Sequence, residues 1–196
     1  MKKILFAASE AVPFMKTGGL ADVTGSLPKY FDKKNYDVRV ILPKYVCMEE
    51  RWKGQLHFLC HFYVNLSWRK QYVGIFETTY DGITYYLVDN EFYFAGNAPY
   101  NNIYEDVEKF AFFSKAVLEA LPYLDFCPDI IHCHDWQTGL IPVYLKNEFQ
   151  ADSFYWGMKS IMTIHNLKFQ GVWDIKTMQG LTGFSASLFT PDKLEF

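Results

Sequence analysis

Residues 2–23 read KKILFAASEAVPFMKTGGLADV, and their order predicts a strand, a glycine-rich turn and the start of a helix. Residues 4–8 form a short, continuous apolar run, which is typical of a strand buried on both faces. LADVTGSLPKYF at 20–31 can form a helix after the turn, and DVRVILPKY at 37–45 predicts a second strand. A strand, a helix and a strand in this order indicate a β-α-β unit of a parallel sheet.

The remaining sequence continues this alternation, with one change of character. Residues 55–89 are rich in aromatic and β-branched side chains and contain the hairpin signal Asp81-Gly82, so we expect antiparallel strands there. The pattern predicts a helix at 105–121, a strand, turn and helix at 128–149, and another buried strand at 160–166. The expected fold class is therefore α/β: a Rossmann-like parallel sheet with helices on both faces and an added antiparallel hairpin region.

Composition excludes several classes of protein. The chain has 196 residues, half of them hydrophobic, which is enough for a substantial core in one domain or slightly more. A net charge of -3 offers no basic surface for nucleic acid, and no window approaches the roughly 18 apolar residues of a membrane span. The N-terminus lacks a convincing secretion signal and the four cysteines form no C-x-x-C pair, so we expect a cytoplasmic protein without disulfides or structural zinc.

Polar residues follow three of the predicted parallel strands. Ser9-Glu10 leads into KTGG, His134-Asp135 ends the strand near residue 130, and His165-Asn166 ends the last strand. Ligands of open α/β sheets bind at the carboxyl ends of the strands. We therefore expect these motifs to converge on one crevice.

The KTGG turn has the chemistry of an anion-binding loop. Gly18 and Gly19 would let backbone N–H groups approach a phosphate, the following helix offers its positive end, and Lys16 adds a compact cation. The alternative is a tight turn that carries a solvent-exposed lysine. The motif matches neither G-x-x-x-x-G-K-[ST] nor G-x-G-x-x-G, so the turn alone leaves both interpretations open.

The histidines raise a metal hypothesis. His132 and His134 lie at alternate strand positions and share one face, but zinc takes three or four protein ligands, so we expect no metal. We assign His132 to the packed interior, and His134 with Asp135 to the mouth of the strand. Asp135 can accept hydrogen bonds from sugar hydroxyls or cap the following helix, and His165 can be structural or functional.

Four stretches together carry a family resemblance. They are KILFAASEAVPFMKTGGLADVTGSLPK at 3–29, VRVILPKY at 38–45, IIHCHDWQTGLIPVYLK at 130–146 and TIHNLKFQG at 163–171. In this order they closely resemble the N-terminal part of bacterial glycogen synthases and plant starch synthases. The resemblance implies a retaining GT-B glycosyltransferase that transfers glucose from ADP-glucose to the non-reducing end of an α-1,4-glucan such as glycogen. ADP-glucose is then a substrate, and neither a cofactor nor a metal is expected.

The resemblance also implies roles for individual residues. Lys16 would contact the sugar nucleotide, and the backbone at Gly18 and Gly19 would approach its phosphates. The other carried-over positions line the glucose and acceptor region or, for the histidine, lie beside the transferred glucose as the catalytic candidate: Asp22, Tyr100, Asp135 and His165. One departure is YEDVEKFAFF at 104–113, where Lys109 occupies the place of an arginine in the family.

The resemblance predicts domain organisation as well. Residues 1–196 would form the first, acceptor-side domain of two, and would stop before that domain ends. A C-terminal nucleotide-binding domain, continuous with it in the full protein, would supply the groups that hold the leaving diphosphate. We therefore expect the chain alone to be inactive.

Three alternatives remain open at this point. The chain could belong to another GT-B nucleotide-sugar transferase such as a sucrose synthase, although KTGGLADV and HNLKFQG count against it. It could be a non-catalytic glucan-binding module. A dinucleotide-binding oxidoreductase domain has the same fold, but the chain lacks G-x-G-x-x-G.

Overall fold

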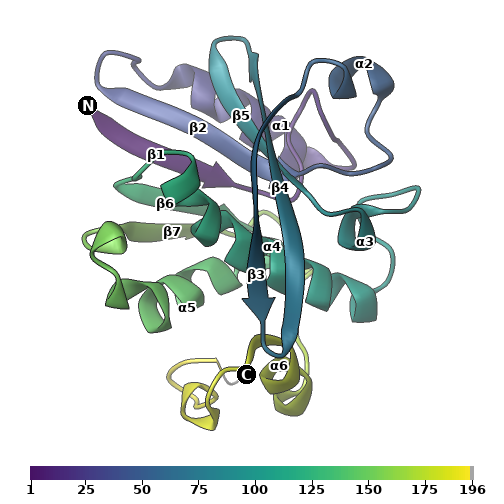
Figure 1. Ribbon diagram of the computed structural model, residues 1–196, viewed down its shortest axis with the longest axis vertical. Coiled ribbons are helices and arrows are strands. Elements are labelled where there is room, and N and C mark those ends of the chain that lie inside the picture. Colours follow the sequence, from purple (N-terminus) through teal and green to yellow (C-terminus); the bar gives the residue numbers. More distant parts are fainter. Residues whose placement is uncertain (195–196) are drawn as a thin grey trace.

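The computed structural model describes residues 1–194, which form one seven-stranded mixed sheet with helices around it (Figure 1). The strand order is β3-β4-β5-β2-β1-β6-β7. The five strands from β5 to β7 in this order are parallel, whereas β4 is antiparallel to both β3 and β5. The strands are β1 Lys2–Ala7, β2 Tyr36–Pro43, β3 His57–Leu66, β4 Arg69–Tyr80, β5 Ile83–Asp89, β6 Ile130–His134 and β7 Lys159–Thr163.

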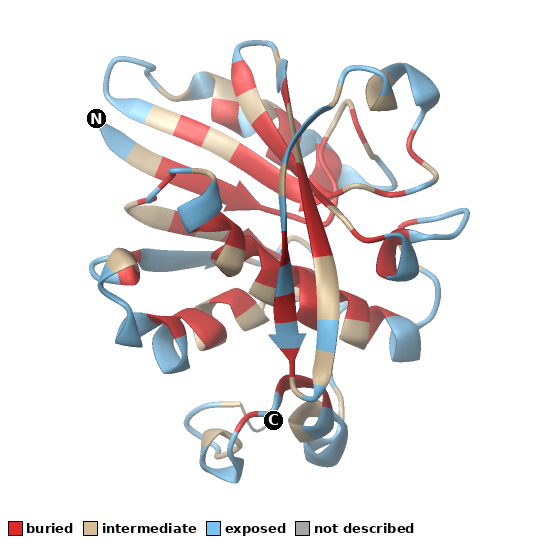
Figure 2. Cartoon of the chain, in the orientation of Figure 1, coloured by how far each residue is buried: buried red, intermediate tan, exposed pale blue. Residues whose placement is uncertain are grey.

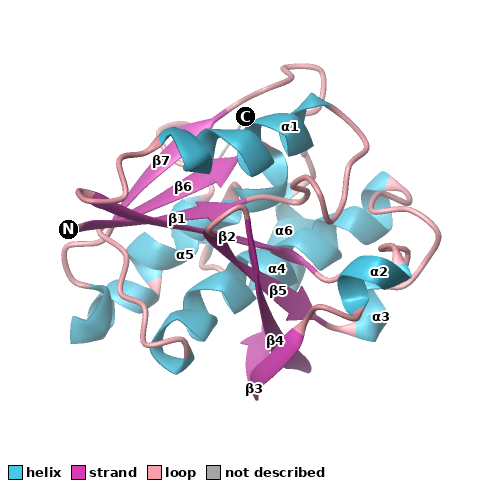
Figure 3. Cartoon of the chain, turned by 90° about the horizontal axis from the view of Figure 1, so that it is seen from above, coloured by secondary structure: helices cyan, strands magenta, loops and turns pink. Residues whose placement is uncertain are grey.

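Helices cover both faces of the sheet, as the sequence predicts. Seen from above, α1 lies on one side of the strands, and α4 and α5 lie on the other (Figure 3). The α-helices are α1 Gly19–Ser26, α2 Glu50–Lys53, α3 Glu91–Phe94, α4 Ile103–Tyr123, α5 Leu140–Asn147 and α6 Ile175–Thr182. Short 3-10 turns are η1 Leu27–Tyr30, η2 Trp136–Thr138, η3 Phe149–Ala151, η4 Ser153–Tyr155 and η5 Ala186–Leu188.

The antiparallel region is attached to one edge of the parallel sheet, which confirms the expected hairpin. Asp81 and Gly82 connect β4 and β5 with φ of 50° and 72°. Positive φ at both central positions is the geometry of the two-residue turn that matches strand twist. β3 and β4 extend beyond the rest of the sheet (Figure 1), and β3 packs against α4.

The core consists of two clusters, one on each face of the sheet, and buried residues concentrate in the central strands and α4 (Figure 2). α4 contributes fully buried rings at Phe112 and Phe113 to the larger cluster. It continues through Pro122 to Tyr123, so it ends slightly later than the predicted 105–121. None of the helices within residues 1–194 is long and apolar enough to cross a membrane.

The prediction of a buried strand at 160–166 is wrong in two respects. β7 ends at Thr163, so His165 lies in the loop that follows it. β7 is also the last strand of the sheet, and Ile161 and Met162 are 47% and 39% exposed because no element within residues 1–194 pairs with its outer edge. An apolar run reports the tendency of a segment to be buried, but not which neighbours cover it.

The order of the strands fixes where a ligand can bind. The chain leaves β1 toward β2 on one side of the sheet, and β6 lies on the other side of β1. The carboxyl ends of β1 and β6 therefore mark a topological switch point, the usual binding place in open α/β sheets. The KTGG turn follows β1, Asp135 follows β6 and His165 follows the adjacent β7.

Candidate active site

The glycines of the KTGG turn are not needed for a tight turn. Gly18 is the N-cap of α1 and is extended, with φ of -150°, a conformation that any residue adopts. Gly19 has no positive φ, and a Cβ added to it would meet no atom within 4 Å. Neither the backbone conformation nor the surrounding atoms of residues 1–194 therefore require glycine at positions 18 and 19. The space beside the turn is open to an approaching ligand.

Lys16 and Asp22 are paired with each other. The Lys16 ammonium lies 2.6 Å and 2.8 Å from the two Asp22 oxygens, and both side chains are about half exposed. An exposed pair of this kind contributes little to stability, because water solvates both partners well. Lys16 is thus held at the mouth of the turn and can exchange its carboxylate partner for a phosphate.

Glu10 holds the turn from below, although the sequence motifs do not assign it a role. The backbone N–H of Thr17 donates a hydrogen bond to Glu10 Oε2, and Glu10 is 3% exposed. A buried carboxylate needs hydrogen-bond donors, and here the turn itself supplies one. The signal that could have identified Glu10 is a charged residue directly after a doubly buried strand.

Tyr100 lies beside the end of β1. Its hydroxyl is 2.7 Å from Ser9 Oγ, and Tyr45 donates a hydrogen bond to the Ser9 carbonyl at 2.8 Å. Burial raises the pKa of Tyr100 above its ordinary value, and the negative charges of Glu10 and Asp135 act in the same direction. Tyr100 therefore remains a neutral phenol that can both donate and accept a hydrogen bond.

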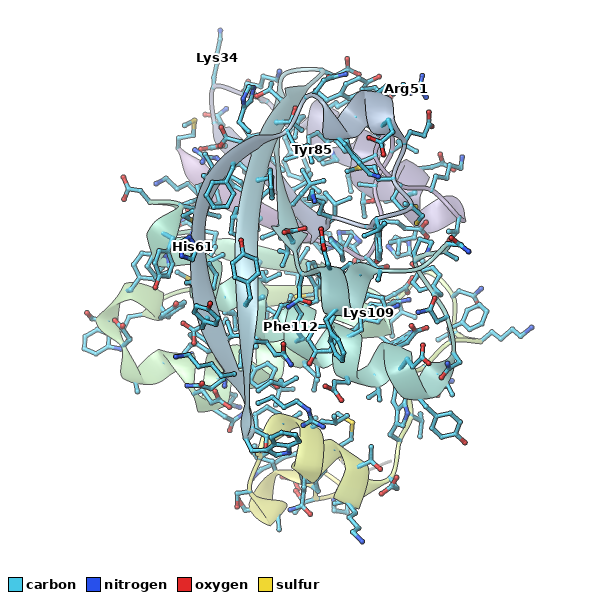
Figure 4. All side chains as sticks on the ribbon, turned by 45° about the vertical axis from the view of Figure 1, so that its right-hand side comes forward. Lys34, Arg51, His61, Tyr85, Lys109 and Phe112 are labelled. Atoms are coloured by element: carbon cyan, nitrogen blue, oxygen red, sulfur yellow. The ribbon has the colours of Figure 1, made fainter. Side chains whose placement is uncertain are left out.

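The loop that carries Tyr100 is fixed by a buried ion pair on α4. Lys109 Nζ lies 2.6 Å from Asp106 and donates a hydrogen bond to the Pro99 carbonyl at 2.6 Å, while Asp106 accepts one from the Asn101 N–H at 3.2 Å. Lys109 and Asp106 are both buried, and Figure 4 labels Lys109 on α4. The family departure at Lys109 thus concerns a residue that positions this loop.

Asp135 does not act as a helix cap. No side-chain cap hydrogen bond forms at η2; instead Asp135 Oδ1 accepts the backbone N–H of His165 at 2.7 Å. Asp135 is buried, and within residues 1–194 its second oxygen has no hydrogen-bond partner. The carboxylate therefore positions one predicted site residue and retains an acceptor for a ligand hydroxyl.

The burial of the two histidines on β6 is the reverse of the expectation. His134 is fully buried, whereas His132 is half-buried and pairs through Nε2 with Thr163 Oγ1 at 2.7 Å. The two histidines share one face of β6 as predicted, and their rings stack. The ring of loop residue His165, however, covers His134, which therefore does not lie open at the strand mouth. No group of His, Cys, Asp or Glu among the described residues has the arrangement of a metal site.

The predicted site residues fall into two adjoining groups. Lys16, Gly18, Gly19 and Asp22 surround the glycine turn, and Tyr100, Asp135 and His165 lie at the ends of β1, β6 and β7. The consecutive residues Ser9 and Glu10 join the groups, because one contacts Tyr100 and the other the turn. Both groups lie at the carboxyl ends of the parallel strands, whereas a single crevice that contains all of them stays a prediction.

An apolar groove of about 500 Å³ lies between α4 and the segments that follow β6 and β7. Its walls include the rings of Trp136, Phe169 and Trp173, and those of Trp136 and Trp173 lie 5.2 Å apart. Gly171 brings the loop against Trp136 with φ of 63°. Aromatic walls of this kind are suited to a ligand that has apolar faces.

Comparisons with known proteins identify a family. The family model described as the starch synthase catalytic domain matches residues 3–196. The chain is 67% identical to a glycogen synthase from Lachnoclostridium phytofermentans and 64% identical to one from Lachnospira eligens, over 195 residues in each case. Each match covers the whole of this chain, which spans only 41% of the length of the relative.

A solved structure shows the same fold. The catalytic domain of starch synthase IV from Arabidopsis thaliana, bound to ADP and acarbose, matches with a TM-score of 0.82 and 29% sequence identity. The match covers 98% of this chain and 39% of that one. The seven-stranded α/β sheet is accordingly part of a GT-B architecture. With the family model extending over nearly every residue, the chain belongs to the starch synthase catalytic domain family.

Proposed function

We propose that the chain forms the acceptor-side domain of a retaining glycosyltransferase that transfers glucose from ADP-glucose to the non-reducing end of an α-1,4-glucan. The observation that carries the proposal is the open glycine turn at the switch point, held by Glu10 and flanked by Lys16. The names of the relatives, glycogen synthase and starch synthase, support this reaction. ADP-glucose and the glucan are the expected partners, and no cofactor is required.

The glycine turn would serve the diphosphate of the donor. The Gly18 and Gly19 backbone and the N-terminus of α1 present N–H groups and a positive dipole, and Lys16 adds a full charge. In a transfer reaction, negative charge accumulates on the departing diphosphate while positive charge develops on the glucose ring. Cationic groups near the phosphates therefore stabilise the transition state more than the ground state.

The second group would serve the sugar. Tyr100 offers a hydroxyl, Asp135 retains one carboxylate oxygen, and His165 is held beside them through its backbone. Hydrogen-bonding groups of both kinds are what a glucose ring with several hydroxyls requires. In this proposal His165 lies against the transferred glucose.

Activity would need more than this chain. The further cations that hold the leaving diphosphate would come from a second domain, and the chain spans 41% of the length of its relatives. We therefore expect negligible glucan extension from ADP-glucose by the 196-residue chain. A cytoplasmic location is supported by its four free cysteines, which a reducing compartment would maintain.

A glucan-binding role without catalysis is the second candidate, and the groove walled by Trp136, Phe169 and Trp173 favours it. Rings of this kind can stack on the apolar faces of sugars. In this case the chain would bind maltoheptaose and ignore ADP-glucose. Binding of ADP-glucose therefore distinguishes the two functions.

The experiment is calorimetric titration of the chain with ADP-glucose and, separately, with maltoheptaose. Lys16→Ala removes a charge-assisted contact to phosphate worth roughly 1.5–3 kcal/mol, so donor binding should weaken about tenfold or more while glucan binding is unchanged. Lys29→Ala is the matched control, because Lys29 forms an ion pair of the same 2.6 Å length with Asp81. Equal donor affinity in the wild type and Lys16→Ala would contradict the assigned role.

A further inference from the structure

His134 and His165 share a direct hydrogen bond between their rings. His134 Nδ1 lies 2.9 Å from His165 Nε2, and the two rings are nearly parallel with centroids 5.2 Å apart. His134 is fully buried against Phe6 on β1 and His132 on its own strand. One of the two nitrogens must donate a proton and the other must accept it, so the pair selects between two tautomeric arrangements.

The environment of His134 keeps its ring neutral. Burial is the main cause that lowers its pKa to about 3, and the neighbouring His132 and His165 lower it further. A neutral imidazole carries one ring proton, either on Nδ1 or on Nε2. The location of that single proton decides what His165 can do.

The unpaired nitrogen of His134 shows which arrangement costs less. Nε2 of His134 is buried and has no hydrogen-bond partner within residues 1–194. A proton on Nε2 would leave a buried N–H without an acceptor, which folded proteins avoid more strictly than an unpaired acceptor. The proton therefore belongs on Nδ1, where it is donated to His165.

We propose that His134 is a positioning residue that fixes the ring orientation and tautomer of His165 by donating its Nδ1–H to His165 Nε2. With Nε2 occupied as an acceptor, neutral His165 carries its own proton on Nδ1. That nitrogen has no hydrogen bond to any of residues 1–194, so it is the donor that the ring offers to a ligand. An N–H donor is suited to an oxygen of a sugar hydroxyl or a phosphate.

The test is a long-range proton–nitrogen NMR spectrum of the uniformly ¹⁵N-labelled chain near pH 7.5. The chain has five histidines, and protonated and bare ring nitrogens differ widely in ¹⁵N shift. The expected result is a proton on Nδ1 in both His134 and His165, with both Nε2 atoms bare. A proton on His165 Nε2 would overturn the proposal.

Variants separate positioning from simple packing. His134→Asn places an amide N–H donor near the former Nδ1 and should preserve the His165 tautomer. His134→Leu keeps an apolar filling but removes the donor, so His165 should shift mainly to the Nε2–H form that imidazole favours in water. His132→Leu is the control from the same stack and should leave His165 unchanged.

Identical His165 tautomers in wild type and His134→Leu would show that His134 does not set the tautomer. If His134→Leu fails to fold, the wild-type and His134→Asn spectra still test whether His134 sets the tautomer of His165. The relevance to substrate rests on the proposed function, but the tautomer does not. The spectrum can also show His165 as the Nδ1–H tautomer with no change in its ¹⁵N shifts when ADP-glucose or maltoheptaose is added. This result would support the positioning role of His134 and contradict the proposed function.

Discussion

The side chain of Asp135 holds the backbone of His165 in place, with Oδ1 accepting the His165 N–H at 2.7 Å. The two residues follow β6 and β7, which are neighbours in the sheet. Asp135 makes this contact from a backbone with φ of 58° and ψ of 177°, a region that is nearly restricted to glycine and costs about 1–3 kcal/mol. The fold tolerates this strain at the point where the predicted site residues meet.

Asp135→Ala and Asp135→Gly should therefore differ in stability. Both lose the hydrogen bond to His165, but only glycine relieves the strained backbone, and the gain is reduced by about 0.4–1 kcal/mol because glycine frees the unfolded chain. We expect the glycine variant to be more stable than the alanine variant by about 1 kcal/mol in urea unfolding. Hydrogen exchange at the His165 amide should accelerate in both. An alanine variant at least as stable as the glycine variant would show that this backbone is not strained.

Gly171 should tolerate alanine less well than Gly157. Both have positive φ, 63° and 82°, but a Cβ on Gly171 would lie 2.5 Å from the Trp136 ring whereas one on Gly157 meets nothing within 4 Å. Gly157→Ala should lose about 1–2 kcal/mol from backbone strain alone. Gly171→Ala should lose a further 1–3 kcal/mol or so from overpacking. Urea unfolding measures both, and equal losses would mean that the loop simply moves away from Trp136.

The buried pair of Lys109 and Asp106 should be intolerant of single changes. Lys109→Met leaves an uncompensated buried carboxylate, which costs about 3–5 kcal/mol. Arg51→Met is the control, because its ion pair with Glu49 is exposed and should change the free energy of unfolding by no more than about 1 kcal/mol. Figure 4 labels both Lys109 and Arg51, the first against α4 and the second at the periphery.

The double variant Asp106→Leu with Lys109→Met tests positioning. It removes both charges, so most of the lost stability should return. The Pro99 carbonyl and the Asn101 N–H, however, lose their partners, and the Tyr100 loop should become more sensitive to proteolysis than in the wild type. Unchanged proteolysis would show that the loop holds without the ion pair.

The parts of the fold that follow from the sequence are those set by local pattern. The apolar run of β1, the Asp81-Gly82 turn and the periodicity of α4 each depend on residues close together in the chain. The convergence of the KTGG turn, Asp135 and His165 also follows, because parallel strands end at the same edge of a sheet. Element bounds differ by only a few residues.

The errors share a non-local cause. His134 is buried and His132 half-buried because a loop 31 residues away covers one ring and not the other. β7 is exposed because it is the last strand of the sheet. The apolar sequence of a strand does not show whether the strand lies at the edge or in the centre of a sheet. The burial of Lys109, about which the sequence makes no prediction, likewise depends on a carbonyl in the preceding loop. Contacts of this kind are decided by tertiary packing rather than by periodicity.

The buried ring of His134 should make the stability of the chain depend on pH. An unfolded histidine has a pKa of about 6.5, whereas burial lowers that of His134 to about 3. Between these values the unfolded chain binds a proton that the native chain does not. The contribution of neutral His134 to the free energy of unfolding is therefore fully present above pH 6.5 and is lost as the pH falls toward 3. The free energy of unfolding falls by up to about 1.4 kcal/mol per pH unit over this range.

His134→Asn removes this titrating group, so its free energy of unfolding should fall less steeply with decreasing pH than that of the wild type. Urea unfolding at pH 7.5, 6, 5 and 4 measures the slopes, and the carboxylates common to both proteins cancel in the difference. His57→Asn is the matched control, because it makes the same substitution at a histidine that is exposed at the start of β3. Parallel curves for His134→Asn and the wild type would mean that His134 accepts a proton in the folded chain, because only then would folding leave its pKa unchanged.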